Sequence, residues 1–586
     1  MIPMRFFLVL VLVWSAPVDA EPPGLRELNP PTFQRGVDNE VRVFGVGFTK
    51  ESELILPFKA EVHGGSNGNE AASFRIKPAA DVATGVYPAR VRTADGISNL
   101  RLVTVVEVPV IRVKEPNGRY RVGKLDLDAV QPIPIPCVIV GNRLERDIDA
   151  FRFTAQAGQR LMLATETWRV GLTPDPLLWL RDGSGRTLAT AHDTPTLQRD
   201  ERLDHTFAKQ GEQILEMRST GGGGWNNYYT VKIGAFDYAR SVFPLGGRKG
   251  ETVSFTVVNR DGKASILKAK VPDDAFSNHW RLPLPDHPGS LPWTLAAGDL
   301  PETIEEEKRS EPQRLEWPIT VNGRISQPGE EDRYRLAVTP GEKVRLRASA
   351  YHLGSALDGY LMAYDPVGKK LLAKNDDEVG RGLPDPALDF EVPAGVREVV
   401  VALRDTTSRG GGEFGYRLTI ERGGPDFHLY LGRKQNPTNQ EDDGWHRLDR
   451  SDTLALTPGQ EAKLRLSVRR TKEDEPHYNG PMRDYAGPIR VTAVNVPKGV
   501  SVKPLVIPAG NTEAELLVIA SAEAPKEPFE IIVVGEGTRP DGTTFRRIAE
   551  RRLHLSDPQM TNLPWNWRVQ KVTCVTTRPA SKEAKR

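Results

Sequence analysis

An internal repeat constrains the fold of this chain more than any other feature. Asp149 recurs 183 residues later as Asp332, and Phe151 recurs at the same offset as Tyr334. Further pairs at this offset are Gly158 and Gly341, Leu163 and Leu346, Asp175 and Asp358, Asp182 and Asp365, Gly185 and Gly368, Leu188 and Leu371, and Asp193 and Asp376. Gly141 and Gly323 are 182 residues apart, whereas Tyr229 and Tyr416 are 187 apart. Slips of this size are typical of insertions in surface loops, so the chain contains two copies of one unit.

Each copy has the pattern of β-strands joined by turns. The stretch FRFTAQAGQRLMLATE, which begins at Phe151, alternates apolar and polar residues around a turn glycine. YRLAVTPGEKVRLRASA, which begins at Tyr334, does the same. A period of two predicts half-buried antiparallel strands. The Asp-x-x-Gly that follows in both copies predicts a hairpin.

The ordered features of the two copies resemble the bacterial pre-peptidase C-terminal domain family. These features are V-x-G/N-G-R, an acidic-x-Asp-x-aromatic-x-apolar segment, the turn at Gly158 or Gly341, D-x-x-G and a closing aromatic strand, YYTVKI or YRLTI. The resemblance implies a small β-sandwich of jelly-roll character in each copy. Such domains usually accompany secreted proteases as binding or processing appendages, and some members bind calcium. The first copy departs from the second at 144–147, where the second has the looser SQPGEED.

The segments between the copies are also predicted to be β. Leu28–Phe48 and Val242–Asn259 share Pro…Arg-x-Gly followed by alternating valines, and they resemble the opening of immunoglobulin-like modules of the IPT/TIG type. A chain of 586 residues is long enough for about four to six domains. We therefore predict an all-β chain of tandem sandwiches. The expected order is a signal peptide (1–20), an immunoglobulin-like domain (25–108), the first repeat (131–235), an immunoglobulin-like domain (236–298), a linker (299–313), the second repeat (314–423), an immunoglobulin-like domain (424–556) and a tail (557–586).

The N-terminus has the pattern of a secretory signal. Met1–Arg5 carries one positive charge, Phe6–Trp14 is apolar, and Val18–Ala20 has small residues at the cleavage spacing. We expect a secreted, periplasmic or cell-surface protein with no membrane segment beyond the signal peptide. The 79 basic and 77 acidic residues nearly cancel, which argues against nucleic acid as a partner.

The sequence has only two cysteines, Cys137 and Cys574. Two distant thiols do not make a disulfide scaffold. They could pair and tether the C-terminal segment to the first half, or remain separate, and the sequence leaves both alternatives open.

Closely spaced acids at the start of one strand in each copy are the main candidate site. Asp147 with Asp149, and Glu330 with Asp332, place carboxylates two residues apart on a strand, about 6–7 Å from each other. Such a pair repels by about 2–3 kcal/mol at an effective dielectric constant near 20. Our first interpretation is structural, with the inward aspartate accepting hydrogen bonds that fix the turn.

The second interpretation of these acids is a calcium site. Asp147, Asp149, Glu330 and Asp332 would be joined by oxygens of the later loop that holds Asp193 in the first copy or Asp376 in the second. Calcium takes six to eight oxygen ligands, and the sequence names only a few. A catalytic acid–base pair is not expected, because repetition at a scaffold position does not separate two pKa values. No other cofactor is predicted.

An aromatic residue on a glycine-rich loop is the candidate contact with a partner. Trp225 lies in GGGGWNNYY, where it could stack on a sugar ring or pack on its own closing strand. We predict a secreted, non-catalytic binding or structural protein that serves adhesion, cell-wall or matrix association, or presentation of a partner. Its partner would be an extracellular protein or polysaccharide. Two alternatives stay open: a carbohydrate- or collagen-binding accessory protein of a secreted peptidase system, and a hydrolase with an unrecognised site.

Overall fold

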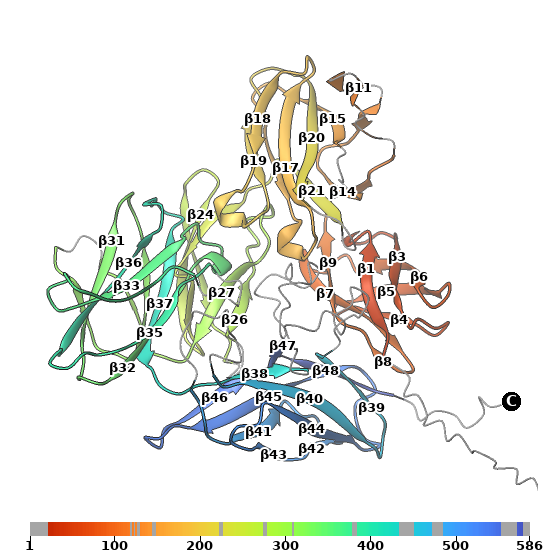
Figure 1. Cartoon of the computed structure of the whole chain (residues 1–586). Coiled ribbons are helices and arrows are strands. Elements are labelled where there is room, and N and C mark those ends of the chain that lie inside the picture. Colours follow the sequence, from red (N-terminus) through yellow and green to blue (C-terminus); the bar gives the residue numbers. More distant parts are fainter. Residues whose placement is uncertain are drawn as a thin grey trace, which may run out of the picture.

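The computed structural model confirms an all-β chain of tandem sandwiches (Figure 1). It describes residues 22–577 except 116, 118–119, 122–123, 126–128, 143–147, 222–226, 274–277, 307–309, 378–383, 433–450, 472–483 and 552–570. The described residues form five sandwiches in chain order, which we call sandwiches 1 to 5. The predicted signal peptide lies outside the described residues.

Sandwich 1 (22–108) packs the sheet β1-β3-β6-β5 against the sheet β2-β9-β7-β4, with β8 beside β7. Its strands are β1 (Gly24–Asn29), β2 (Thr32–Gln34), β3 (Asn39–Val46), β4 (Glu53–Ile55), β5 (Ala60–Ser66), β6 (Ala71–Pro78), β7 (Gly85–Thr93), β8 (Gly96–Ile97) and β9 (Arg101–Val106). Alternating valines of β3 point into the core, as the sequence pattern predicted.

Sandwich 2 (109–235) has the sheet orders β10-β14-β21-β16-β19 and β13-β15-β20-β17-β18. Its strands are β10 (Val110–Arg112), β13 (Gln131–Pro132), β14 (Cys137–Asn142), β15 (Asp149–Ala155), β16 (Arg160–Thr165), β17 (Asp175–Asp182), β18 (Thr187–Ala191), β19 (Arg202–Thr206), β20 (Gly211–Gly221) and β21 (Tyr228–Gly234), with a separate pair β11 (Tyr120–Arg121) and β12 (Lys124–Leu125). Short 3₁₀ turns η2 (Trp168–Val170) and η3 (Pro195–Leu197) lie at one end.

Sandwich 4 (299–423) repeats the strand order of sandwich 2, with the sheets β28-β30-β37-β32-β35 and β29-β31-β36-β33-β34. Its elements are β28 (Glu302–Ile304), β29 (Gln313–Leu315), β30 (Ile319–Arg324), β31 (Glu331–Ala337), β32 (Lys343–Ser349), η4 (Tyr351–Leu353), β33 (Gly359–Tyr364), β34 (Leu371–Asn375), β35 (Ala387–Glu391), β36 (Glu398–Asp405) and β37 (Gly415–Arg422). The repeat in the sequence is therefore a repeat in topology.

Sandwiches 3 and 5 precede and follow the second copy in the chain. Sandwich 3 (236–298) has two three-stranded sheets, β22-β24-β25 and β23-β27-β26. Its strands are β22 (Ala239–Phe243), β23 (Gly246–Arg248), β24 (Thr252–Asn259), β25 (Ala264–Lys270), β26 (His279–Leu282) and β27 (Trp293–Gly298). Sandwich 5 (426–577) comprises β38 (His428–Leu431), β39 (Thr453–Leu456), β40 (Glu461–Arg469), β41 (Ile489–Val494), β42 (Val500–Val502), β43 (Leu505–Ile507), β44 (Glu513–Ala520), β45 (Phe529–Thr538), β46 (Thr544–Ile548), β47 (Glu550–Arg551) and β48 (Val572–Thr576).

Two expected segment assignments are wrong. The predicted linker 299–313 contains β28, which pairs in parallel with β30 as an edge strand of sandwich 4. The predicted tail 557–586 contains β48, which lies between β39 and β45 in sandwich 5. The two strands are only three and five residues long, which leaves little room for a period of two, and acidic residues follow β28 in the sequence.

Side-chain contacts join each sandwich to the next and the last to the first. Each joint includes a hydrogen bond: Tyr228 to Glu27 (2.9 Å), Arg260 to Asp204 (2.6 Å), Trp293 to the Leu353 carbonyl (2.9 Å), Arg345 to Asp426 (2.6 Å) and Arg90 to Asp452 (2.9 Å). Figure 1 shows the resulting closed arrangement, in which β8 of sandwich 1 meets β39 of sandwich 5. The joints combine these polar contacts with apolar ones, since Val86 and Leu102 of sandwich 1 pack in one cluster with Val170 of sandwich 2.

Candidate functional site

The repeated aspartate is tied to a repeated tyrosine in both copies. In sandwich 2, Tyr229 lies directly across from Gly141 in the β14–β21 pair, and its hydroxyl donates a hydrogen bond to Asp149 at the start of β15. A Cβ at Gly141 would overlap the Tyr229 ring. The glycine therefore lets the ring lie over the strand, and the hydroxyl reaches the other sheet.

Sandwich 4 has the same arrangement with its own residues. Tyr416 is the cross-strand partner of Gly323, and its hydroxyl lies 2.6 Å from Asp332 Oδ2. A Cβ at Gly323 would overlap the Tyr416 ring. The Gly, Asp and Tyr of each repeat thus form one bridge between the two sheets, and their recurrence has a structural cause.

Two further side chains enlarge the cluster in sandwich 4. Tyr416 Oη is also 2.9 Å from Glu305 Oε2 and in contact with the hydroxyl of Tyr334. Each tyrosine hydroxyl carries one proton. If Tyr334 donates to Tyr416, Tyr416 can donate to only one carboxylate, so the other carboxyl group must itself be protonated to donate. In that arrangement, one proton shared by Glu305 and Asp332 would complete the hydrogen bonds of the cluster.

The electrostatics of this cluster agree with that count. Burial and the neighbouring charge of Glu305 raise the pKa of Asp332 to about 8. Burial also raises the pKa of Glu305. One oxygen of each carboxyl group, Glu305 Oε2 and Asp332 Oδ2, is within hydrogen-bond distance of the Tyr416 hydroxyl, so the pair is tied into the sandwich.

The acidic residues predicted to form a calcium site do not converge on one point in the structure. Glu330 accepts a hydrogen bond from the Gln327 N–H (2.9 Å) and closes a turn. Asp332 on β31 and Asn375 on β34 lie in one row across the sheet, with β36 and β33 between them. Asp376 directly follows Asn375 in the chain. Three strand spacings amount to about 14 Å, which far exceeds the span of one calcium ion with ligands at about 2.3–2.6 Å. Asp147 lies outside the described residues.

A different acidic group does gather at the end of sandwich 2. Side-chain ligand atoms of Asp175, His192 and Asp193 lie within 4.8 Å of one another. His192 and Asp193 are exposed. Three side chains fall short of the six to eight ligands of calcium, and an exposed acidic group is no evidence of an ion by itself.

The remaining residues singled out in the sequence are Trp225 and the two cysteines. Trp225 lies outside the described residues. Cys137 and Cys574 are unpaired and sit in the cores of sandwiches 2 and 5. Burial raises the pKa of each thiol to about 12, so neither cysteine is poised to react.

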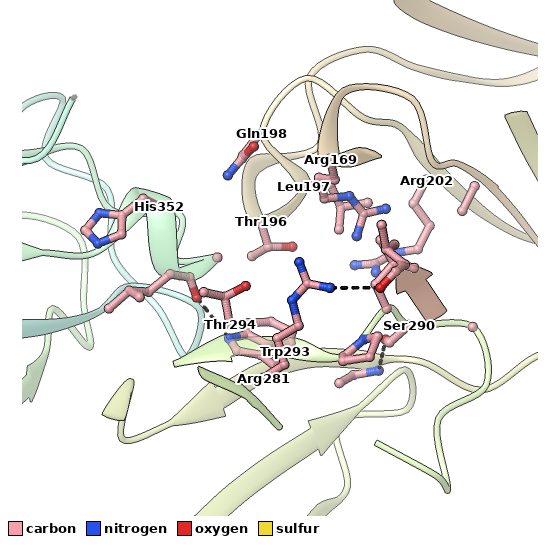
Figure 2. Close-up of a pocket in the computed structure, with 18 residues that line it drawn as sticks. Arg169, Thr196, Leu197, Gln198, Arg202, Arg281, Ser290, Trp293, Thr294 and His352 are labelled. Carbon is pink, nitrogen blue, oxygen red and sulfur yellow. Dashed lines mark hydrogen bonds between the residues drawn. The ribbon is translucent and has the colours of Figure 1, made fainter. Parts of the chain in front are cut away.

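A pocket lies where sandwiches 1 to 4 meet (Figure 2). Sandwich 1 contributes Val86, sandwich 2 Arg169, sandwich 3 Arg281 and sandwich 4 His352. The pocket volume is about 80 Å³. Because no single sandwich encloses it, the pocket depends on how sandwiches 1 to 4 pack against one another.

Equivalent turns of the two repeats face this pocket. In sandwich 2 the carboxylate of Asp200 accepts hydrogen bonds from backbone N–H groups of η2 and from Arg169 Nε (2.9 Å). In sandwich 4 Asp385 accepts a bond from the Tyr351 N–H (2.8 Å) and contacts His352 Nδ1. Each buried aspartate fixes a 3₁₀ turn, and the turn's second residue lines the pocket.

The remaining polar lining comes from β19 and sandwich 3. Arg281 reaches from β26 toward Thr196, with Arg169 and Arg202 beside the same space (Figure 2). Arg281 donates a hydrogen bond to the Val86 carbonyl (3.2 Å). Trp293 forms the floor and is held by its bond to the Leu353 carbonyl.

Sequence reasoning did not find this pocket. Its residues are far apart in the chain, and no motif links them. One signal was present: β19 carries Arg202 where the second repeat has Ala387. A departure of one repeat from the other at a single position can indicate a role outside the shared fold.

Comparisons with known proteins give no family. No family model and no curated protein matches the chain. Solved structures with some similarity include the Bacteroides ovatus mixed-linkage glucan utilization locus protein SGBP-B in complex with a heptasaccharide (9% identity, 67% of this chain, 71% of that chain, TM-score 0.11). Another is a tetra-tandem repeat of a large adhesion protein (7% identity, 90% of this chain, 98% of that chain, TM-score 0.12). TM-scores this low do not establish a shared arrangement. In the described part of the chain, no helix has both the length and the apolar character needed to cross a membrane.

Proposed function

We propose that the protein is an exported, non-catalytic binding protein whose ligand site is the pocket between sandwiches 1 to 4. The observation that carries the proposal is that four sandwiches each supply side chains to one pocket. A tandem array in which sandwiches act independently has no need of specific contacts between all of its neighbours. A fixed site built from several sandwiches does need them.

The expected partner is an extracellular polysaccharide or protein. Export is inferred from the apolar Phe6–Trp14 run that precedes the small residues of Val18–Ala20. The resemblance of both repeats to pre-peptidase C-terminal domains supports an accessory role in adhesion, wall association or presentation of a partner. The half-buried carboxyl pair of sandwich 4 is assigned to the scaffold, because its hydrogen bonds are made within the sandwich.

The test is a binding screen of the purified full-length protein. Soluble polysaccharides, collagen peptides and peptidoglycan fragments are titrated, and the same mixtures are assayed for cleavage products. A bulky variant, Thr294→Trp, blocks the pocket from β27. Ile266→Trp is the matched control, because Ile266 lies on β25 of the same sandwich and is 61% exposed.

The proposal expects saturable binding of at least one polymer without turnover. That binding should be lost in Thr294→Trp and kept in Ile266→Trp. Equal binding by both variants would place the ligand elsewhere. Steady cleavage of any polymer would show that the protein is an enzyme.

A further inference from the structure

The pocket lining has a strong excess of positive charge. Arg169, Arg202 and Arg281 are part of the lining, and no Asp or Glu is among the described residues that line it. Buried cationic groups are costly unless an opposite charge is near. The excess therefore calls for a negatively charged occupant.

Arg169 is already balanced by a protein group. Its Nε lies 2.9 Å from Asp200 Oδ2, and Asp200 is fully buried behind the lining. A second bond, from Nη2 to the Thr165 carbonyl (3.1 Å), fixes the side chain further. Arg169 is thus held in place and contributes a positioned donor, while its charge is offset.

Arg202 is not balanced in this way. Within the described structure its guanidinium makes no hydrogen bond or ion pair, and its contact is with the ring of Tyr238, 3.8 Å from the ring centroid. Burial lowers the pKa of Arg202 to about 10, although the neighbouring Tyr238 and the more distant carboxylates of Glu413 and Asp204 act in the opposite direction. A guanidinium has five N–H donors, and those of Arg202 have no acceptor beside the pocket.

Arg281 faces the same space from the opposite wall. It donates to the Val86 carbonyl (3.2 Å), and burial lowers its pKa to about 10. Arg202 and Arg281 come from β19 of sandwich 2 and β26 of sandwich 3. An anion between them would bind both sandwiches at once.

The second repeat shows that the sandwich fold does not require Arg202. In sandwich 2 the cross-strand pair is Ala164 with Arg202. In sandwich 4 the equivalent pair is Arg347 with Ala387, so the arginine stands on the other strand. Arg347 is not among the pocket residues. The sandwich fold itself therefore does not require an arginine at position 202, which lines the pocket and lies over the Tyr238 ring.

We infer that the pocket binds a compact oxyanion, a carboxylate, sulfate or phosphate group, with Arg202 as its main ligand and Arg281 and Arg169 around it. This inference rests on the proposed function and names the chemistry of its ligand. Arginine matches such groups with two parallel hydrogen bonds. The volume of about 80 Å³ suits one such group, whereas drug-sized ligands occupy about 300–1,000 Å³. The group can be free, or it can be the charged substituent of an acidic polymer.

The experiment is calorimetric titration of the full-length protein with sodium sulfate, sodium phosphate and sodium glucuronate at constant ionic strength. Glucose is the neutral reference. Arg202→Ala adopts the residue of the second repeat, and Arg202→Gln keeps more of the side-chain volume. Arg347→Ala removes the equivalent arginine of sandwich 4 and is the matched control. Dextran sulfate against dextran then distinguishes a polymer-borne group from a free ion.

At least one anion should bind saturably, with at least tenfold weaker binding in both Arg202 variants and unchanged binding in Arg347→Ala. If dextran sulfate binds much more tightly than sulfate, the natural ligand is the charged group of a polymer. If the two bind with equal affinity, the natural ligand is a free ion. Absence of saturable binding by every anion would overturn the inference, as would equal binding in Arg202→Ala. If a neutral polymer binds in the earlier screen while all anions fail, the proposed function stands and this inference falls.

Discussion

Arg90 of sandwich 1 donates a 2.9 Å hydrogen bond to Asp452 of sandwich 5, and this pair closes the arrangement of the five sandwiches. Asp452 is fully buried, and Arg551 lies 3.3 Å from its other oxygen. One carboxylate thus faces two arginines at the joint between the first and last sandwiches.

Asp452→Asn should loosen this joint. Removing one partner of a buried ion pair leaves uncompensated charge and typically costs about 3–5 kcal/mol. We expect faster hydrogen exchange at β8 and β39 and little change in sandwich 4. Glu53→Gln removes the exposed partner of Arg92 and should have almost no effect. Unchanged exchange in Asp452→Asn would show that the joint does not depend on this pair.

Removing Asp332 should change how stability depends on pH. The folded-state pKa of Asp332 is about 8, above its ordinary value of 3.8, so folding takes up a proton between these pH values. Stability from this group is complete at low pH and declines as the pH rises from 3.8 to 8. We expect the Tm of the wild type to fall more steeply than that of Asp332→Asn between pH 5 and 9. Asp376→Asn, an exposed acid of the same sandwich, should follow the wild type. Parallel curves for wild type and Asp332→Asn would contradict the shared proton.

Gly141→Ala should destabilise sandwich 2. The added Cβ would overlap the Tyr229 ring, and overpacking of this kind typically costs about 1–3 kcal/mol. Gly211→Ala is the control, because a Cβ there meets only one atom, at 3.9 Å. Chemical denaturation followed by tyrosine and tryptophan fluorescence measures both variants. Equal midpoints would mean that the tyrosine can move at no cost.

Chelation should leave the stability unchanged. Asp149 and Asp332 are bonded to tyrosine hydroxyls, and Asp376 is about 14 Å from Asp332 along the sheet. Calorimetric scans with EDTA and with added calcium should therefore give the same Tm. A drop with EDTA that disappears in Asp193→Asn would assign an ion to the cluster at the end of sandwich 2.

The repeat explains why the fold was predictable and the pocket was not. Alternation around Phe151 and Tyr334 is a local signal, so the strands of both copies could be predicted from the sequence. The glycine and tyrosine that bridge the two sheets also recur in both copies. Their contact with the aspartate joins opposite sheets, so no fixed spacing in the sequence predicts it. Arg202 and Arg281 meet only through packing between sandwiches. Packing between distant segments leaves no periodic pattern in the sequence. The short strand β48 was missed for the same reason, because it is defined by its pairing with the distant strands β39 and β45.

Small-angle X-ray scattering of the full-length protein tests the central claim, that the five sandwiches form one closed body, most directly. A compact chain of this length should give a radius of gyration of about 25–30 Å. Sandwiches strung in an open row would give roughly 45 Å or more, with a scattering profile of an elongated particle. A value in the lower range supports the pocket and the joints that build it, and a value in the upper range would contradict both.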